Sequence, residues 1–428
     1  MYGRILFSIL LLNNLFAQDK VTILFTNNVN GELENCLCED RPLGSLEKLV
    51  FQIQKIREST DQAIVIDAGD FFTPFGEVEK NLLILEALDI IKYDALAVGD
   101  QEFAAGVRFF RNVIYPKVKQ YQTINLELSG KSIGKPKIFK LKGGTRIAVL
   151  GLINEQVFKY YTPDKVRGIK VTDPVQALKT ALPDIVNKAD FIILLSHSGI
   201  EEDRLLAEKF KDIDLIIGAH SQVKILHPEK VNQTYIVQTD GNGHYLGRIE
   251  LKFSKAKTIE TFESLPVTIE IDLPNAPQIV KLAVKDNFKN LLVFINSQNI
   301  KIRIPENYLV ESSQTCASCH SKEYTSWQKS VHAKSFKTLQ NENKTRLLKC
   351  VNCHVSGFGR EDGYINTNLT PEMASVNCTE CHLTSAVHLS SSKKTDVQKI
   401  KPETCIKCHD NENDPKFDFE MDKALIKH

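Results

Sequence analysis

The sequence predicts two domains of different fold class: an α/β domain, followed by a small domain that is mostly helical and irregular. Three observations support this division. Short apolar, β-rich runs alternate with helical stretches from Val21 to Phe253, as in a sheet covered by helices. The C-terminal part is rich in Lys, Ser, Thr and Asn and has few apolar residues for its size. Eight of the ten cysteines lie between Cys316 and Cys408, so we expect a domain boundary before Cys316.

The expected strands of the first domain are apolar on both faces, as in sheets that helices cover. They are Val21–Phe25, Ala63–Asp67, Ala95–Val98, Gln122–Leu126, Arg146–Leu152, Phe191–Leu195, Leu215–Ile217, Tyr235–Gln238 and Arg248–Phe253. The expected helices between them are Ser45–Glu58, Asn81–Ile91, Pro174–Ala189 and Glu201–Lys211.

Residues 254–311 contain four prolines and one expected helix near Gln278–Leu292, and we interpret them as a connecting segment. The two domains are then expected at 18–253 and 312–428. The second domain has too few apolar side chains to build a core from them alone.

The N-terminal residues 1–17 have the features of a secretory signal peptide. Arg4 is basic, Ile5–Leu12 is apolar, and Ala17 precedes a polar stretch. The apolar run is too short to cross a bilayer of about 30 Å. The alternative is a buried first strand or helix. We expect a periplasmic or otherwise exported protein without a transmembrane segment in its mature chain. The net charge of +1 gives no reason to expect a nucleic-acid partner.

The motif C-x-x-C-H occurs four times, and it is the attachment signature of c-type haem. Two thiols bond the haem vinyl groups, and the adjacent imidazole binds the iron. The alternative is zinc, but zinc sites do not require a histidine directly after each cysteine pair. We therefore expect four covalently bound haem c groups, at Cys316, Cys319 and His320; Cys350, Cys353 and His354; Cys378, Cys381 and His382; and Cys405, Cys408 and His409.

Three further histidines of this domain, His332, His388 and His428, are candidate distal ligands. Three ligands for four irons leave one iron short. That iron is either five-coordinate or bound by Met373, Met421, a cysteine or a residue of the other domain. For any one of these histidines, a plain surface position is the alternative.

The segment Gln314–His428 resembles the tetrahaem cytochromes that take electrons from hydroxylamine oxidoreductase. The resemblance rests on Cys316–His320 followed by Trp327–Ala333, on Val376–His382 followed by His388, and on the ending Ile426–His428. It implies closely packed haems, most with two histidine ligands and sometimes one high-spin iron, and redox partner proteins in the periplasm.

Polar segments follow several strands of the first domain, where α/β folds place their chemistry. They are Thr26–Gly31, Asp67–Asp70, Gly99–Phe103, Leu195–Gly199 and Gly218–Gln222. Their order and spacing resemble the calcineurin-like metallophosphoesterases, especially the 5'-nucleotidase branch. This resemblance covers about Val21 to Phe253 and implies an α/β/β/α sandwich holding two metal ions bridged by a carboxylate.

Transferred position by position, the resemblance makes Asp70 the bridging carboxylate and His197 and His220 imidazole ligands of one metal ion. Asp100 stands where an asparagine ligand is usual, and Gln222 stands where relatives have histidine or glutamine. Three positions depart from the family pattern: Asn28 replaces an aspartate ligand, Asn30 a histidine ligand, and Gln101 the histidine that assists the reaction.

These residues predict an exported electron-transfer cytochrome with a phosphoesterase-like domain that is inactive or holds one divalent ion (Mn, Zn or Fe). Two alternatives stay open: a redox enzyme acting at a five-coordinate haem, and a metal-dependent phosphohydrolase joined to a cytochrome. Cys36 and Cys38 form a strained disulfide, or serve as ligands or redox thiols.

Overall fold

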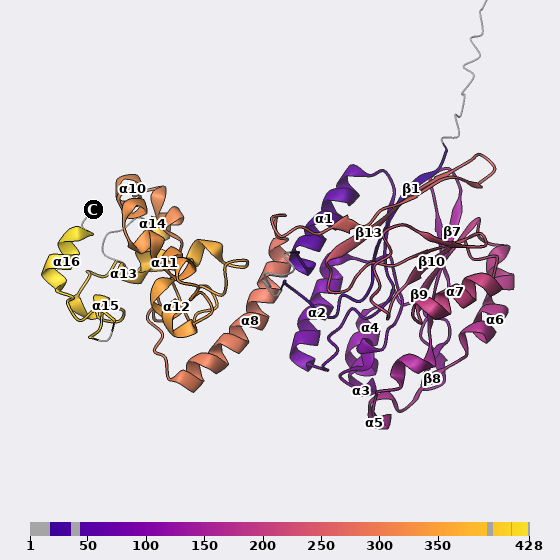
Figure 1. Cartoon of the computed structure of the whole chain (residues 1–428), viewed down its shortest axis with the longest axis horizontal. Helices are drawn as coiled ribbons and strands as arrows, with labels where there is room; N and C mark the ends of the chain where they lie inside the picture. The colour runs from indigo at the N-terminus through magenta and orange to yellow at the C-terminus, as the bar shows by residue number, and fades with distance from the viewer. Residues whose placement is uncertain (1–17, 36–42, 392–396, 412, 427–428) are drawn as a thin grey trace, which may run out of the picture. The chain divides into compact units, whose positions relative to one another are not determined.

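A computed structural model describes residues 18–35, 43–391, 397–411 and 413–426. The chain divides into two compact units, Met1–Ile279 and Val280–His428, and each is considered by itself. Three sequence predictions fall outside the described residues: the signal peptide at 1–17, the Cys36–Cys38 pair, and His428. Figure 1 shows strands throughout the first unit and short helices in the second.

The first sheet of the N-terminal unit has the strand order β14-β13-β1-β2-β3, with β15 paired to β13. β1, β2 and β3 are parallel, and β13 is antiparallel to β1. Thr26 lies opposite Asp67, and Asp67 lies opposite Leu96, so the carboxyl ends of the three parallel strands meet at one edge. The bounds are β1 (Lys20–Thr26), β2 (Ala63–Asp67), β3 (Ala95–Leu96), β13 (Tyr245–Phe253), β14 (Ile259–Ser264) and β15 (Val267–Thr268).

The second sheet has the order β11-β12-β10-β9-β7-β6, in which β7, β9, β10 and β12 are parallel. Ser196 of β9 lies opposite Gly218 of β10, so these two strands also end side by side. The bounds are β6 (Lys137–Lys140), β7 (Arg146–Ile153), β9 (Phe191–His197), β10 (Leu215–Gly218), β11 (Glu229–Val231) and β12 (Thr234–Val237).

An apolar layer lies between the two sheets. Alternate side chains of β1, namely Val21, Ile23 and Phe25, are buried in it together with Ile193 and Leu195 of β9. Each such aliphatic side chain contributes about 1.5–3 kcal/mol when it leaves water. The period-two pattern of the strands therefore holds the sheets face to face.

Helices cover the outer faces of both sheets. In Figure 1, α1 and α2 lie on one side of the sheets, and α6 and α7 lie on the other. This is the α/β/β/α sandwich that the sequence predicts. The bounds of the four helices are α1 (Leu46–Ser59), α2 (Val78–Ile91), α6 (Pro174–Val186) and α7 (Ile200–Lys209).

The start of α6 shows how local sequence places these helices. The carboxylate of Asp173 accepts a hydrogen bond from the backbone N–H of Gln176 at 2.9 Å, and Pro174 occupies the first turn. Leu178 and Leu182 then pack on the outer face of the second sheet. A capped start and an apolar stripe together determine where α6 lies.

Short elements complete the N-terminal unit. They are the sheet of β5 (Lys131–Ser132), β4 (Leu126–Leu128) and β8 (Ile169–Val171), with η1 (Gln101–Phe103), α3 (Val107–Phe109), η2 (Phe110–Ile114), α4 (Tyr115–Lys117), η3 (Glu155–Phe158) and α5 (Pro163–Val166).

The predicted strand Gln122–Leu126 is wrong except for its last residue, which begins β4. The segment instead links the two sheets. The N–H of Gln122 donates to the carbonyl of Leu96 at 2.8 Å, and the N–H of Ile124 donates to that of Gly151 at 2.9 Å. The segment is buried although Gln122, Thr123 and Asn125 are polar, and a mixed polar and apolar pattern of this length does not distinguish it from a strand.

Residues 254–311, which the prolines suggest to be a connection, are divided between the two units. β14 and β15 extend the first sheet, and α8 (Pro277–Gln298) crosses the boundary at Ile279. Ile304 and Val310 belong to the apolar core of the second unit.

The C-terminal unit is helical and irregular, as predicted, and its core is small. Leu291, Ile295, Phe336 and Val351 are buried together in it. Among the described residues, no helix is both long enough and apolar enough to cross a membrane. The elements after α8 are α9 (Ser313–Ala317), α10 (Ser321–Lys329), η4 (His332–Lys334), α11 (Ser335–Asn341), α12 (Leu348–His354), η5 (Pro371–Met373), α13 (Cys378–Cys381), α14 (Ala386–Ser391), α15 (Pro402–Cys405) and α16 (Phe419–Leu425).

Candidate functional site

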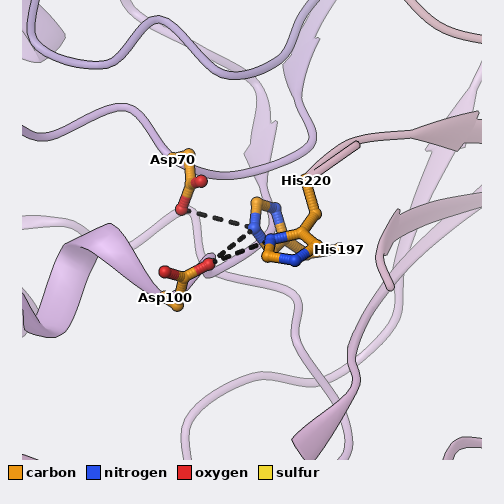
Figure 2. A group of neighbouring side chains, drawn as sticks. All are labelled: Asp70, Asp100, His197 and His220. Carbon is orange, nitrogen blue, oxygen red and sulfur yellow. Dashed lines mark hydrogen bonds and ion pairs between the residues drawn. The ribbon is translucent and has the colours of Figure 1, made fainter. Parts of the chain in front are cut away.

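Four predicted ligands meet at the strand ends of the N-terminal unit. Asp70 follows β2, Asp100 follows β3, His197 ends β9 and His220 follows β10. Each offers one ligand atom, and these atoms all lie within 4.8 Å of one another. Figure 2 shows the two carboxylates facing the two imidazole rings. Because the four residues come from both sheets, the sandwich itself brings this cluster together.

His197 is the buried centre of the cluster. Its Nε2 lies 3.3 Å from Asp70 Oδ1 and 3.3 Å from Asp100 Oδ1, and its Nδ1 lies 3.0 Å from the carbonyl oxygen of Ala68 (Figure 2). A proton on Nδ1 can be donated to that carbonyl, which leaves the Nε2 lone pair for a metal ion. This is the usual arrangement of a metal-binding histidine.

Charge in the cluster favours a cation. Burial works against protonation of His197, but Asp70 and Asp100 outweigh it and raise the pKa of the imidazole well above its usual value. Burial opposes ionisation of Asp100 as well, yet hydrogen bonds from His197 and His220 hold its pKa below the usual range. The two carboxylates thus attract positive charge, which a divalent ion would supply in place of protons.

The fourth residue opens the cluster to solvent. His220 Nδ1 lies 3.2 Å from Asp100 Oδ1, and the His220 side chain is 38% exposed, whereas His197 is fully buried. A water molecule or a small substrate can therefore reach the cluster from the His220 side.

The backbone at this site is strained and tightly packed. Asp70 and His220 have φ values of 60° and 68°, which non-glycine residues rarely adopt. A β-carbon on Gly99 would lie 2.3 Å from Asp70 Oδ1 and 2.7 Å from His197 Cε1. The glycine is needed because two ligands approach its backbone closely.

Two residues that support the cluster were not among the ligands predicted from the sequence. Tyr161 donates its hydroxyl to Asp100 Oδ2 at 3.1 Å. The carboxylate of Glu102 accepts the N–H groups of Gly99 at 2.9 Å and Phe71 at 3.2 Å, and burial raises its pKa to about 8. Tyr161 holds a ligand, and Glu102 ties together the two loops that carry Asp70 and Asp100. Tyr161 is distant in sequence from every motif, so no spacing signalled it.

The neighbouring half of the site is built from amides. Asn30 Oδ1 accepts from Gln101 Nε2 at 3.0 Å, and Asn30 Nδ2 donates to Asn242 Oδ1 at 2.7 Å. The side-chain oxygen of Gln222 lies on this side: it and Asn30 Nδ2 stand 3.0 and 3.1 Å from where a β-carbon on Gly241 would be. Gln222 is thus beside the amides.

Two atoms of this amide group lack hydrogen-bond partners within the described part of the chain. They are Asn28 Nδ2 and Gln101 Oε1, and both residues are buried. Asn28 Oδ1 accepts from the backbone N–H of His220 at 2.9 Å. Neutral amides offer a divalent ion far less than carboxylates and imidazoles do. The residues present fit one metal ion and do not fit a second.

In the C-terminal unit, each cysteine motif forms a helical turn. The backbone N–H groups of His320, His382 and His409 donate to the carbonyls of Cys316, Cys378 and Cys405, four residues earlier, at 2.8 to 3.0 Å. Residues three apart share one face of a helical turn. The two thiols of a motif therefore point the same way, beside the histidine, as thioether attachment requires.

Two pairs of histidine rings have the separation of imidazoles on opposite sides of one iron. The ring centres of His320 and His388 are 6.2 Å apart, and those of His332 and His409 are 6.1 Å apart. An imidazole nitrogen binds a transition metal at about 2.0 Å, which puts two such ring centres about 6.3 Å apart. His388 thus lies next to the histidine of the first motif, and His332 lies next to that of the fourth.

Hydrogen bonds on the far nitrogens support this interpretation. His409 Nδ1 lies 2.8 Å from Asp414 Oδ2, and His354 Nδ1 lies 2.7 Å from the carbonyl oxygen of Ser335. Metal-bound imidazoles donate their second N–H to such groups. Both rings are therefore oriented with Nε2 available for iron.

Cavities of haem-like dimensions lie at the motifs. One, of about 610 Å³, is lined by the cysteines of the second and fourth motifs. The other, of about 400 Å³, is lined by Cys378, Cys381 and His382 with the ring of Trp327. The Trp327 side-chain N–H donates to the carbonyl of Val376 at 2.9 Å, which fixes the ring there. Thiols, imidazoles and apolar walls fit haem at these positions.

Comparison with known proteins agrees with both units. Residues 35–224 match the calcineurin-like phosphoesterase family, and residues 315–383 match the cytochrome c554 and c-prime family. The second match includes three of the four cysteine motifs; Cys405–His409 lies beyond it.

Individual relatives are of the nucleotidase type. The chain is 26% identical to a mouse (Mus musculus) 5'-nucleotidase over 69% of its own length and 57% of that protein. It is 27% identical to an apyrase of Tabanus yao, over 68% of this chain and 55% of the apyrase. The phosphoesterase YfkN of Bacillus subtilis shares the fold, with a TM-score of 0.54, 22% identity, and 65% and 99% of the two chains covered.

The chain spans little more than half the length of these curated relatives. It combines a 5'-nucleotidase-like phosphoesterase domain with a C-terminal segment similar to cytochrome c554.

Proposed function

We propose that this chain is an exported tetrahaem c-type cytochrome that transfers electrons, and that its phosphoesterase-like domain holds a single divalent ion. The observation that carries the first part is the pair of histidine ring separations, 6.1 and 6.2 Å, each linking a C-x-x-C-H histidine to a histidine from elsewhere in the unit. Bound haem supplies one-electron chemistry between ferric and ferrous iron.

The chain's own residues determine where an electron can reside. The cysteine pairs would hold each haem, and at the first and fourth motifs two histidines would bind the iron, which would favour electron transfer over substrate binding there. Asp414 would accept a hydrogen bond from His409 Nδ1–H and so increase the basicity of that ligand. A more basic ligand stabilises ferric iron, and we expect a low potential at the fourth motif.

Intact-mass analysis and iron determination test this proposal directly. The full chain is produced in a host that attaches haem c in its periplasm. We expect four haem masses and four irons per chain, and three of each after Cys350→Ala and Cys353→Ala together. A mass equal to that of the polypeptide alone, or zinc in place of iron, would refute the proposal.

A five-coordinate haem enzyme is the second candidate. It is favoured by the sequence count, since three further histidines, His332, His388 and His428, are available for four C-x-x-C-H motifs. Electron paramagnetic resonance separates the two: we expect low-spin ferric signals for the first and fourth haems, and a high-spin signal would identify an open iron. A spectrum without low-spin signals contradicts the proposed histidine pairs.

The single metal ion follows from charge. Two carboxylates, Asp70 and Asp100, balance one divalent ion, while the adjacent amides supply no charge for a second. Gln101 occupies the position of the histidine that assists phosphoester cleavage, and losing such a group costs about 10²–10⁴ in rate. We expect the domain to bind metal and to hydrolyse phosphoesters slowly or not at all.

Metal analysis combined with an assay tests this second part. The purified protein should bind one Mn, Zn or Fe ion per chain beyond the haem iron, and Asp70→Ala should abolish that binding. Rapid turnover of a generic phosphoester with added manganese, lost in Asp70→Ala, would instead identify an active phosphohydrolase.

A further inference from the structure

Arg303 connects three of the four cysteine motifs. It lies between α8 and α9, ahead of the segment that matches the cytochrome family, and it is 7% exposed. Its side chain contacts Asn352 inside the second motif and Glu380 inside the third. Its carbonyl oxygen accepts a hydrogen bond from Lys407 of the fourth motif at 3.0 Å.

Every N–H group of this guanidinium has a partner. Nη1 donates to the carbonyl oxygen of Asn352 and, at 2.6 Å, to its side-chain oxygen. Nη2 donates to the carbonyl of Val355 at 2.9 Å and to Glu380 Oε1 at 3.3 Å, and Nε donates to Glu380 Oε2 at 3.0 Å. An arginine has five such donors, and all five are used. Arg303 therefore positions protein groups and is not free to bind a substrate.

Glu380 completes a buried charge pair. Its side chain is 6% exposed, and it also accepts the backbone N–H of Gly357 at 2.7 Å. Arg303 and Glu380 both line the cavity of about 610 Å³, together with Cys353, Cys381 and Cys408. Charges that are removed from water interact strongly with their surroundings. A change in the charge of an iron bound at this cavity would therefore change its electrostatic interaction with both Arg303 and Glu380.

We propose that the Arg303–Glu380 pair holds the second, third and fourth haem motifs in register and sets the reduction potentials of the haems that they bind. The inference rests on the proposed haem attachment. Reduction removes one positive charge from an iron centre. A nearby cation therefore favours the reduced state, and a nearby anion favours the oxidised state.

Opposite substitutions give opposite predictions. Arg303→Gln leaves the Glu380 carboxylate uncompensated, so the potentials of the adjacent haems should fall. Glu380→Gln leaves the Arg303 cation uncompensated, so they should rise. The double variant removes both charges and should return towards the wild type. Loosened packing alone would shift both single variants in the same direction, because either change breaks the same contacts.

The experiment is a spectroelectrochemical titration of the full-length haem protein and these three variants. We expect each single variant to change the reduction equilibrium of the affected haems at least tenfold, which is about 59 mV for one electron. Arg303→Lys retains the charge and should titrate close to the wild type. Arg360→Gln is the matched control, since Arg360 pairs with Asp362 and does not line this cavity.

Each outcome can be separated from failure of the haem proposal. Mass analysis of the wild type first establishes whether four haems are attached; fewer than four would refute the proposed function and not this inference. With four haems present in the wild type and both single variants, equal or same-direction shifts would overturn the role of the charge pair. A shift in Arg303→Lys as large as in Arg303→Gln would overturn it too.

Discussion

At the scale of single residues, the two halves of the phosphoesterase-like site differ in charge. One half has Asp70, Asp100, His197 and His220, whose ligand atoms lie within 4.8 Å of one another. The other half has side-chain amides that hydrogen-bond to one another, such as Asn30 with Gln101. Charged and imidazole ligands hold a divalent ion well, whereas neutral amides bind one far more weakly. Because only one half of the site carries charged ligands, we expect the site to hold a single metal ion.

Tyr161 should influence metal binding through Asp100. Removing the hydroxyl that donates to Asp100 Oδ2 frees that carboxylate to rotate, and loss of such an outer contact typically lowers metal affinity about 10–100-fold. Tyr161→Phe is therefore expected to weaken binding of manganese by this amount in a titration. The adjacent Tyr160 is 85% exposed, and Tyr160→Phe is a matched control that should bind normally. Equal affinities of the two variants would contradict the role of Tyr161.

Asp203 should make the stability of the N-terminal unit depend on pH. Burial raises the pKa of this fully buried carboxyl group to about 8, against about 3.9 in an unfolded chain. Between these values the unfolded chain has released the proton that the folded chain keeps, so the free energy of unfolding falls as pH rises, by about 1.4 kcal/mol per unit. Asp203→Asn should remove this slope.

Urea unfolding measured between pH 5 and pH 8 checks this expectation. The free energy of unfolding of the wild type minus that of Asp203→Asn should decrease steadily as pH rises. A constant difference would show that Asp203 does not titrate in this range.

At the scale of elements, the site depends on loops that leave parallel strands at one edge of each sheet. Asp70 and Asp100 follow β2 and β3 of the first sheet, and His197 and His220 lie at the ends of β9 and β10 in the second. Parallel pairing with aligned ends is what puts these loops together. The close packing leaves no space for extra atoms at Gly99.

Gly99→Ala should disrupt the site from within the loop after β3. The new β-carbon would lie 2.3 Å from Asp70 Oδ1, so the loop must move. We expect a loss of about 1–3 kcal/mol in unfolding free energy, typical of overpacking, together with loss of metal binding. Gly144→Ala is the control. Gly144 has a left-handed φ of 97° but open space where the β-carbon would lie, so the variant protein should still bind its metal ion. Normal metal binding by Gly99→Ala would contradict the tight packing.

At the scale of the whole molecule, each unit has its own apolar core. The first has the layer between its sheets, and the second has a small cluster that includes Leu291 and Phe336. The second cluster is the smaller of the two, and we expect bound haem to add apolar contacts to it. The prosthetic groups and the metal ion should therefore stabilise different units.

Removing the divalent ion should affect only the N-terminal unit. A ligand that binds the folded state alone stabilises it by mass action, about 2.7 kcal/mol at one hundred times its dissociation constant. When a chelator is added, thermal unfolding followed by far-ultraviolet circular dichroism should show a lower transition midpoint for the strand-rich N-terminal unit. The haem Soret band should report an unchanged transition of the other unit. A shift of both transitions by the chelator would contradict separate cores.

The sequence predicted the positions of most strands and all four residues of the Asp70 cluster, because strand-end motifs such as Asp67–Asp70 are local. It failed at Gln122–Leu126, because this segment bonds to Leu96 on one side and to Gly151 on the other and so links the two sheets. It also did not reveal Tyr161 or Arg303, because their partners lie far away in the chain and no spacing relates them.

The sequence by itself determined the chemistry available to this protein: the spacing of thiols and imidazoles defines haem attachment, and amides replace charged ligands in one half of the other site. Only the tertiary structure decided which groups act together. It brought the ring of His388 to 6.2 Å from that of His320 and the ring of His332 to 6.1 Å from that of His409, and it placed Gln222 beside the amides. The physical reason is that covalent attachment depends on neighbours in sequence, whereas coordination and charge pairing depend on distances that folding alone sets.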